Sequence, residues 1–260
     1  MPRPGIAAVH AVDTGSDGPE TEPGQGHRSA PYASVTVGDA FRALLLVALY
    51  LAVFAGVVIG LHASHLVEQT RSSAPFVLLI GLSLAPVLAL YVHLVRRRRL
   101  SWSDLGFARP RWRLLHLLWQ VPLGIGCALA VQALVLTLVF GSTARERTPG
   151  GITEEFLSGS ASVVLVALLS LVLVAPLWEE VLFRGAFFAG FLRRFGRYRA
   201  VLLSALVFAA VHGTPLVMPY VLVLGLFLGW LRWFHRSLWA SLVLHMTNNA
   251  LVALVVSSSM

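Results

Sequence analysis

The stretch Trp178-Glu179-Glu180-Val181-Leu182-Phe183-Arg184-Gly185 places two carboxylates and one guanidinium inside a long apolar region. Apolar residues run from Val163 to Leu177 before it and from Ala186 to Leu192 after it. Of the twelve acidic residues in the chain, these two are the only ones within the apolar runs. A charge at the centre of a bilayer costs about 2.5–3.5 kcal/mol on insertion scales. Such residues therefore indicate a functional site inside a membrane.

The composition favours a polytopic membrane protein. The 260 residues are 57% hydrophobic and only 12% charged, with a mean hydropathy of +0.77, which leaves too little polar surface to coat a soluble globule. The formal charge of +8 comes entirely from arginines, and most of them lie in short joints between apolar runs. That distribution orients a membrane protein and does not indicate nucleic-acid binding. We expect an all-α bundle of about seven transmembrane helices.

The apolar runs and the arginines between them predict the topology. Seven arginines fall within residues 96–113, whereas the preceding joint holds Arg71 alone, which places 96–113 and the N-terminus in the cytoplasm. The sixth run ends at Arg232, His235 and Arg236, which we assign to another cytoplasmic joint. We expect the chain to lie in a bacterial plasma membrane. The seven runs cover residues 43–61, 74–95, 114–140, 160–192, 200–212, 219–231 and 238–256.

The same pattern divides the chain into four parts. Residues 1–37 are polar and rich in glycine and proline, and they predict a disordered cytoplasmic tail. Residues 38–142 are accessory transmembrane helices with a basic loop, 143–159 an outer loop, and 160–258 the core with the carboxylate pair. The fourth run is about 50 Å of helix, longer than one crossing needs. We expect a break at Pro176, with the part after Gly185 lying along the cytoplasmic interface.

Ionisable side chains from three runs are expected at similar depths. Counting helical rise from the nearest arginine clusters places Glu180, His212 and His245 about 20, 20 and 14 Å below the cytoplasmic edge. Glu180 and Arg184 stand at i and i+4, the favourable order for an ion pair on one helix face. Glu179 points about 100° away. We therefore expect Arg184 to hold Glu180 while Glu179 faces a cavity.

This set supports attack of water on an acyl bond. A carboxylate in a low-dielectric site can act as a general base, and a neighbouring histidine can orient the water. A second histidine with an amide can donate to the developing oxyanion. His245 shares a helix face with Asn249, and Asn248 could take the place of Asn249. A zinc site is the alternative, with Glu179, His212 and His245 as ligands, although the sequence contains no H-E-x-x-H motif.

At these residues the sequence resembles a known family. Glu179-Glu180-x-x-x-Arg184, Phe208-x-x-x-His212 and His245-x-x-x-Asn249 are similar to the three motifs of the CPBP (CAAX protease and bacteriocin-processing) intramembrane proteases, which include the type II CAAX prenyl endopeptidases. The likeness covers residues 160–256.

This resemblance implies a helical membrane endopeptidase with a cytosol-facing site. Glu179 would activate water with Glu180 and Arg184 as its partners, His212 would assist the water, and His245 and Asn249 would stabilise the oxyanion. The resemblance is compatible with zinc and with a metal-free mechanism. The partners it implies are the bilayer and a peptide or protein substrate, and prenylated substrates do not carry over with the motifs.

Two other functions use the same residues. A small proton-coupled transporter would employ the glutamates and histidines as a relay, and it would be expected to repeat a discontinuous helix in both halves of the chain. The first three apolar runs hold no counterpart to the segment with the glutamate pair. A catalytically silent membrane chaperone would keep the polar cluster as a structural lock.

Overall fold

The computed structural model describes residues 35–63, 74–108, 112–141 and 160–258, and these residues are helical with short connections. Within these ranges, six helical segments are long and apolar enough to cross a membrane. The expected all-α polytopic membrane bundle is therefore confirmed. The fifth predicted run forms α8 (Arg197–Val211), whose 15 residues make a helix of about 22 Å. This helix is shorter than the other six, so the number of membrane-length helices is six and not seven.

Two predicted segments fall largely outside the described residues. These are the disordered tail and the outer loop 143–159. The last residues assigned to the tail are ordered, since Val35 is fully buried and Thr36 accepts from and donates to Asp39 at the start of α1 (Val37–Ala63). The Thr36 and Asp39 side chains satisfy backbone N–H groups that the first helical turn would otherwise leave without partners.

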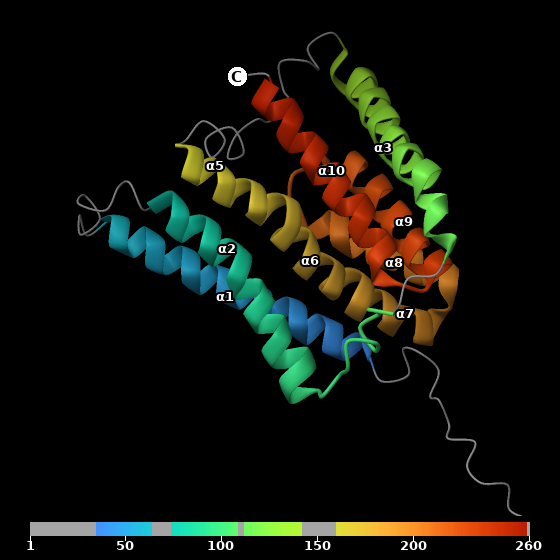
Figure 1. Ribbon diagram of the computed structural model, residues 1–260, viewed down its shortest axis with the longest axis horizontal. Helices are drawn as coiled ribbons and strands as arrows, with labels where there is room; N and C mark the ends of the chain where they lie inside the picture. The colour runs from blue at the N-terminus through green and yellow to red at the C-terminus, as the bar shows by residue number, and fades with distance from the viewer. Residues whose placement is uncertain (1–34, 64–73, 109–111, 142–159, 259–260) are drawn as a thin grey trace, which may run out of the picture.

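One helical rod runs through the middle of the bundle from Ala161 to Phe195, 35 residues in all (Figure 1). It consists of α5 (Ala161–Leu168), the π-helical stretch η5 (Leu169–Val174), α6 (Ala175–Glu180), the π-helical turn η6 (Val181–Phe187) and α7 (Phe188–Phe195). The predicted break at Pro176 is wrong, because the chain stays helical there. The Ala175 N–H already donates to the Ser170 carbonyl five residues back, so the wider π pattern accommodates the missing N–H of Pro176.

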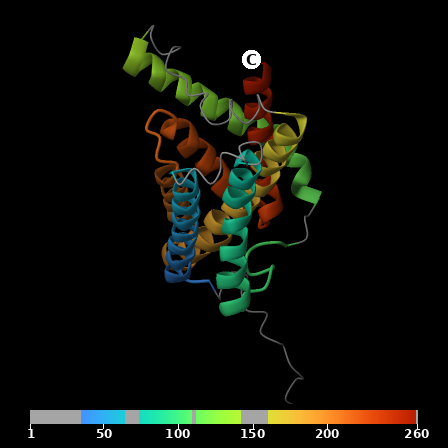
Figure 2. The ribbon, with the colours of Figure 1, turned by 90° about the vertical axis from the view of Figure 1, so that its left-hand side faces the viewer.

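The other helices surround this rod on two sides. α1 and α2 (Ala74–Leu90), which continues as the π-helical η2 (Tyr91–Arg97), pack on one side (Figure 1). α8, α9 (Met218–His235) and α10 (Leu238–Ser258) pack on the other. α3 (Leu117–Phe140) lies outside them against α9 and α10, as the turned view in Figure 2 also shows. Residues 180–191 of the rod are all buried, as expected of a helix with neighbours on every side.

Candidate active site

The Glu180–Arg184 ion pair lies at the centre of the rod. Arg184 Nη1 donates to Glu180 Oε1 at 3.0 Å, and both side chains are 0% exposed. The pair predicted from the i,i+4 spacing is therefore present. Arg184 Nη2 also donates to the Gly225 carbonyl on α9 at 3.2 Å, and its guanidinium carbon lies 4.3 Å from the centre of the Phe208 ring. These contacts surround the buried cation with an anion, a carbonyl and an aromatic face.

His245 joins this pair to the second glutamate. Its Nδ1 lies 3.0 Å from Glu180 Oε1, and its Nε2 lies 3.6 Å from Glu179 Oε2. Since a carboxylate paired with arginine only accepts hydrogen bonds, Nδ1 carries the hydrogen and donates to Glu180. Nε2 then faces Glu179. Residues from the rod and α10, 65 positions apart, thus meet in one cluster.

Glu179 occupies the rim of the cluster. Its side chain is 15% exposed, whereas that of Glu180 is 0% exposed. Its Oε2 is buried and has no hydrogen-bond partner within the described part of the chain. Glu180 is thus held by Arg184 and His245 as expected, and that Glu179 faces a cavity stays a prediction.

His212 follows directly after the last residue of α8. Its Nδ1 is 2.8 Å from the Phe208 carbonyl, which fixes the hydrogen on Nδ1 because a carbonyl only accepts. The ring packs edge-on against Phe208 at 4.5 Å, and the residue is exposed. His212 lies within electrostatic range of Glu179, although no hydrogen bond joins the two among residues 160–258. The second motif therefore contacts the first through Phe208, whose ring lies against Arg184.

Asn249 is bonded to the rod. Its Nδ2 donates to the Leu171 carbonyl at 2.9 Å, and Asn248 Nδ2 donates to Asn249 Oδ1 at 3.1 Å. Asn248 Oδ1 in turn accepts from the Tyr220 hydroxyl on α9. In the i→i−5 pattern of η5, Leu171 would accept from residue 176, which is a proline and has no N–H. Asn249 therefore satisfies a carbonyl that the proline leaves without a backbone partner.

The predicted zinc ligands do not form a metal site in this arrangement. No group of three or more histidine, cysteine, aspartate or glutamate side chains is placed to hold a metal within the described residues. His245 Nδ1 is directed at Glu180, and its Nε2 lies 3.6 Å from Glu179 Oε2. The choice between zinc and no cofactor therefore stays a prediction.

Arg232 is the residue of this region that the sequence reasoning missed. It is 0% exposed, and its Nε donates to the Arg184 carbonyl at 3.3 Å. A Cβ on Gly106, whose φ is +101°, would lie 2.0 Å from Arg232 Nη2, so the loop after η2 closes over this guanidinium only with glycine at 106. The missed signal is helical spacing, because Arg232 continues the buried face of α9 formed by Val221, Leu224, Gly225, Leu228, Gly229, Leu231 and His235.

Six membrane-length helices around a buried glutamate, histidine and arginine cluster define an integral membrane protein with a polar site inside the bilayer. Residues 161–251 match the family model described as Type II CAAX prenyl endopeptidase Rce1-like. This match confirms the similarity to the CAAX protease family that the three motifs indicate, and it supports a protease. Neither the comparison with curated proteins nor that with solved structures found a match.

Proposed function

We propose that the protein is an intramembrane endopeptidase that hydrolyses peptide bonds of membrane-associated substrates with a water molecule activated by Glu179. The observation that carries the proposal is the position of His245. Its two ring nitrogens face Glu180 and Glu179, so one imidazole links the held carboxylate to the exposed one.

The geometry supports a reaction in which Glu179 takes a proton from water while the water oxygen attacks the carbonyl carbon. When His245 is neutral, its Nε2 can receive that proton from Glu179 and give it to the leaving amine. The Glu180–Arg184 pair keeps Nδ1 protonated and the ring oriented. The amine leaves with the proton as the carbonyl reforms, so the products are a free amine and a carboxylic acid.

Two further side chains suit the remaining tasks. An amide nitrogen carries two hydrogens, and the Leu171 carbonyl takes only one of those on Asn249, so the other can donate to the oxyanion. His212 Nε2, with Nδ1 fixed on the Phe208 carbonyl, is available to accept from the attacking water. We further propose that the site opens to the cytosol, as the resemblance of the three motifs implies.

The test compares membrane-protein fragments from cells that contain the native protein with those from cells that contain Glu179→Gln. The amide is nearly isosteric with the carboxylate, so expression should be unchanged. General-base catalysis contributes about 10²–10⁴-fold, and cleavage should fall by that order. Glu155→Gln, in the predicted outer loop, is the matched control and should cleave normally. Retained cleavage with Glu179→Gln would remove Glu179 from the chemistry.

A further inference from the structure

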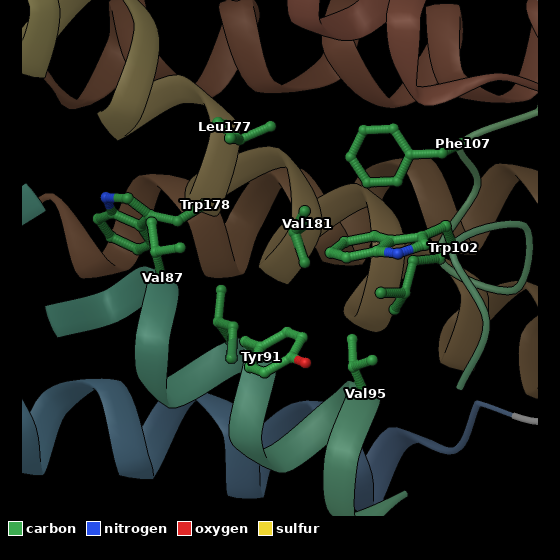
Figure 3. Close-up of a pocket in the computed structure, with 10 residues that line it drawn as sticks. Val87, Tyr91, Val95, Trp102, Phe107, Leu177, Trp178 and Val181 are labelled. Carbon is green, nitrogen blue, oxygen red and sulfur yellow. The ribbon is translucent and has the colours of Figure 1, made fainter. Parts of the chain in front are cut away.

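An apolar pocket opens between α2–η2 and the rod, on the side of the rod opposite α10 (Figure 3). Its volume is about 150 Å³. The loop 102–107 closes one end with two aromatic rings, and no charged side chain lines it. The residues that shape it include Val87, Tyr91, Trp102, Phe107, Trp178 and Val181.

The pocket lies beside the glutamate pair and under the arginine-rich edge. Trp178 and Val181 directly flank Glu179 and Glu180 in the rod. On the other wall, the lining residue Val95 is followed at once by Arg96–Arg99. Val87 is nine residues before Arg96, which corresponds to about 13 Å of helix. The pocket therefore lies in the leaflet on the arginine-rich side of the bilayer.

The lining fits a hydrocarbon chain better than a peptide. A peptide segment would bring N–H and C=O groups into a space that offers almost nothing to bond them, and each such group costs several kcal/mol in an apolar medium. An acyl chain brings no such groups. A dry cavity of about 150 Å³ with aliphatic and aromatic walls holds benzene, so this volume suits a section of chain and excludes a headgroup.

The arginines that follow the lining residue Val95 in the chain indicate the headgroup. Arg98 is engaged by Asp39, with Nε 2.9 Å and Nη2 3.0 Å from its carboxylate oxygens. Arg96, Arg97 and Arg99 are exposed. We propose that this pocket binds the acyl chain of an anionic phospholipid, whose headgroup phosphate pairs with Arg96, Arg97 and Arg99. The proposal does not depend on proteolytic activity.

The test uses the full chain, purified and delipidated in detergent, with phosphatidylglycerol and phosphatidylcholine of identical acyl chains added in native mass spectrometry. We expect one phosphatidylglycerol per protein to be retained at least about tenfold more tightly than phosphatidylcholine. Arg96→Gln, Arg97→Gln and Arg99→Gln together should abolish that preference. The same changes at Arg194, Arg197 and Arg199, in α7 and at the start of α8, are the matched control and should preserve it.

Separate variants test whether the acyl chain lies in the pocket. Val87→Trp fills the pocket and should weaken phosphatidylglycerol retention at least about tenfold. Leu88→Trp, the neighbouring position whose side chain is 53% exposed outside the pocket, should leave retention unchanged. If Val87→Trp does not fold, the native chain still provides a readout: a photoreactive group in the acyl chain should label residues 87–95 and 177–181.

Three outcomes would overturn the proposal. Equal retention of both lipids by all variants would mean that only bulk lipid associates. Labelling confined to other helices would place the lipid elsewhere. A Val87→Trp variant that retains lipid like the native chain but no longer cleaves an apolar peptide would assign the pocket to the substrate instead.

Discussion

Glu180 Oε1 accepts two hydrogen bonds at 3.0 Å, one from Arg184 in the same helix and one from His245 in α10. The ion pair could be predicted from sequence because i,i+4 neighbours meet wherever the chain is helical. The contact with His245 depends on how α10 packs against the rod, and no local pattern specifies it. Counting helical rise predicted only that the two residues share a depth.

The buried pair makes a prediction about stability. Glu180→Ala leaves the Arg184 guanidinium buried without its anion, and breaking such a pair costs about 3–5 kcal/mol. We expect a lower folded yield and a lower midpoint of thermal unfolding in detergent. Replacing both partners, with Glu180→Leu and Arg184→Met, should recover most of the stability without cleavage. Normal thermal stability of Glu180→Ala would contradict the ion pair as described.

At the scale of the elements, Pro176 and Asn249 are coupled through the Leu171 carbonyl. Asn249→Ala leaves that buried carbonyl without a partner, which costs about 1–3 kcal/mol. In the Pro176→Ala background a backbone N–H becomes available to Leu171, so Asn249→Ala should cost less. A double-mutant cycle on the free energy of unfolding measures the difference. Additive effects would show that the proline and the amide act independently.

The loop after η2 is held to α9 and α10 through Gly106. Its carbonyl accepts from the Leu238 N–H at 2.8 Å, and its missing Cβ makes room for Arg232. Gly106→Ala combines a clash with a positive φ and should destabilise the fold by about 1–3 kcal/mol. Gly126→Ala in α3, where a Cβ would meet nothing within 4 Å, is the control and should stabilise by up to about 1 kcal/mol. Thermal unfolding of both variants tests this pair of expectations.

The rod continues as a helix through Pro176, where the sequence predicts a break. Proline inside an apolar run predicts a break, because its ring removes a donor and clashes with the preceding turn. The structure keeps the rod continuous by widening the preceding turns at η5, where the amide of Asn249 from α10 donates to the Leu171 carbonyl. A prediction from the sequence around Pro176 could not include a partner 73 residues away.

For the whole molecule, six of the seven apolar runs became membrane-length helices, since long runs of apolar residues predict spanning helices with little dependence on tertiary packing. The side of the membrane that each end faces is still a prediction from the arginines. In a Cys127→Ala background, Ser257→Cys should react with an impermeant maleimide on intact cells. Arg97→Cys should react only after permeabilisation, and the reverse pattern would invert the topology. Both positions are exposed.

The shortness of α8 has a consequence for the surrounding lipid. At 15 residues it extends about 22 Å, against roughly 30 Å of hydrocarbon. The exposed turn from His212 to Pro215 therefore ends about 8 Å before the far headgroups. Such hydrophobic mismatch is relieved when the bilayer thins or when water fills the gap. We therefore expect the thickness of the membrane around the turn between α8 and α9 to affect how readily water reaches His212.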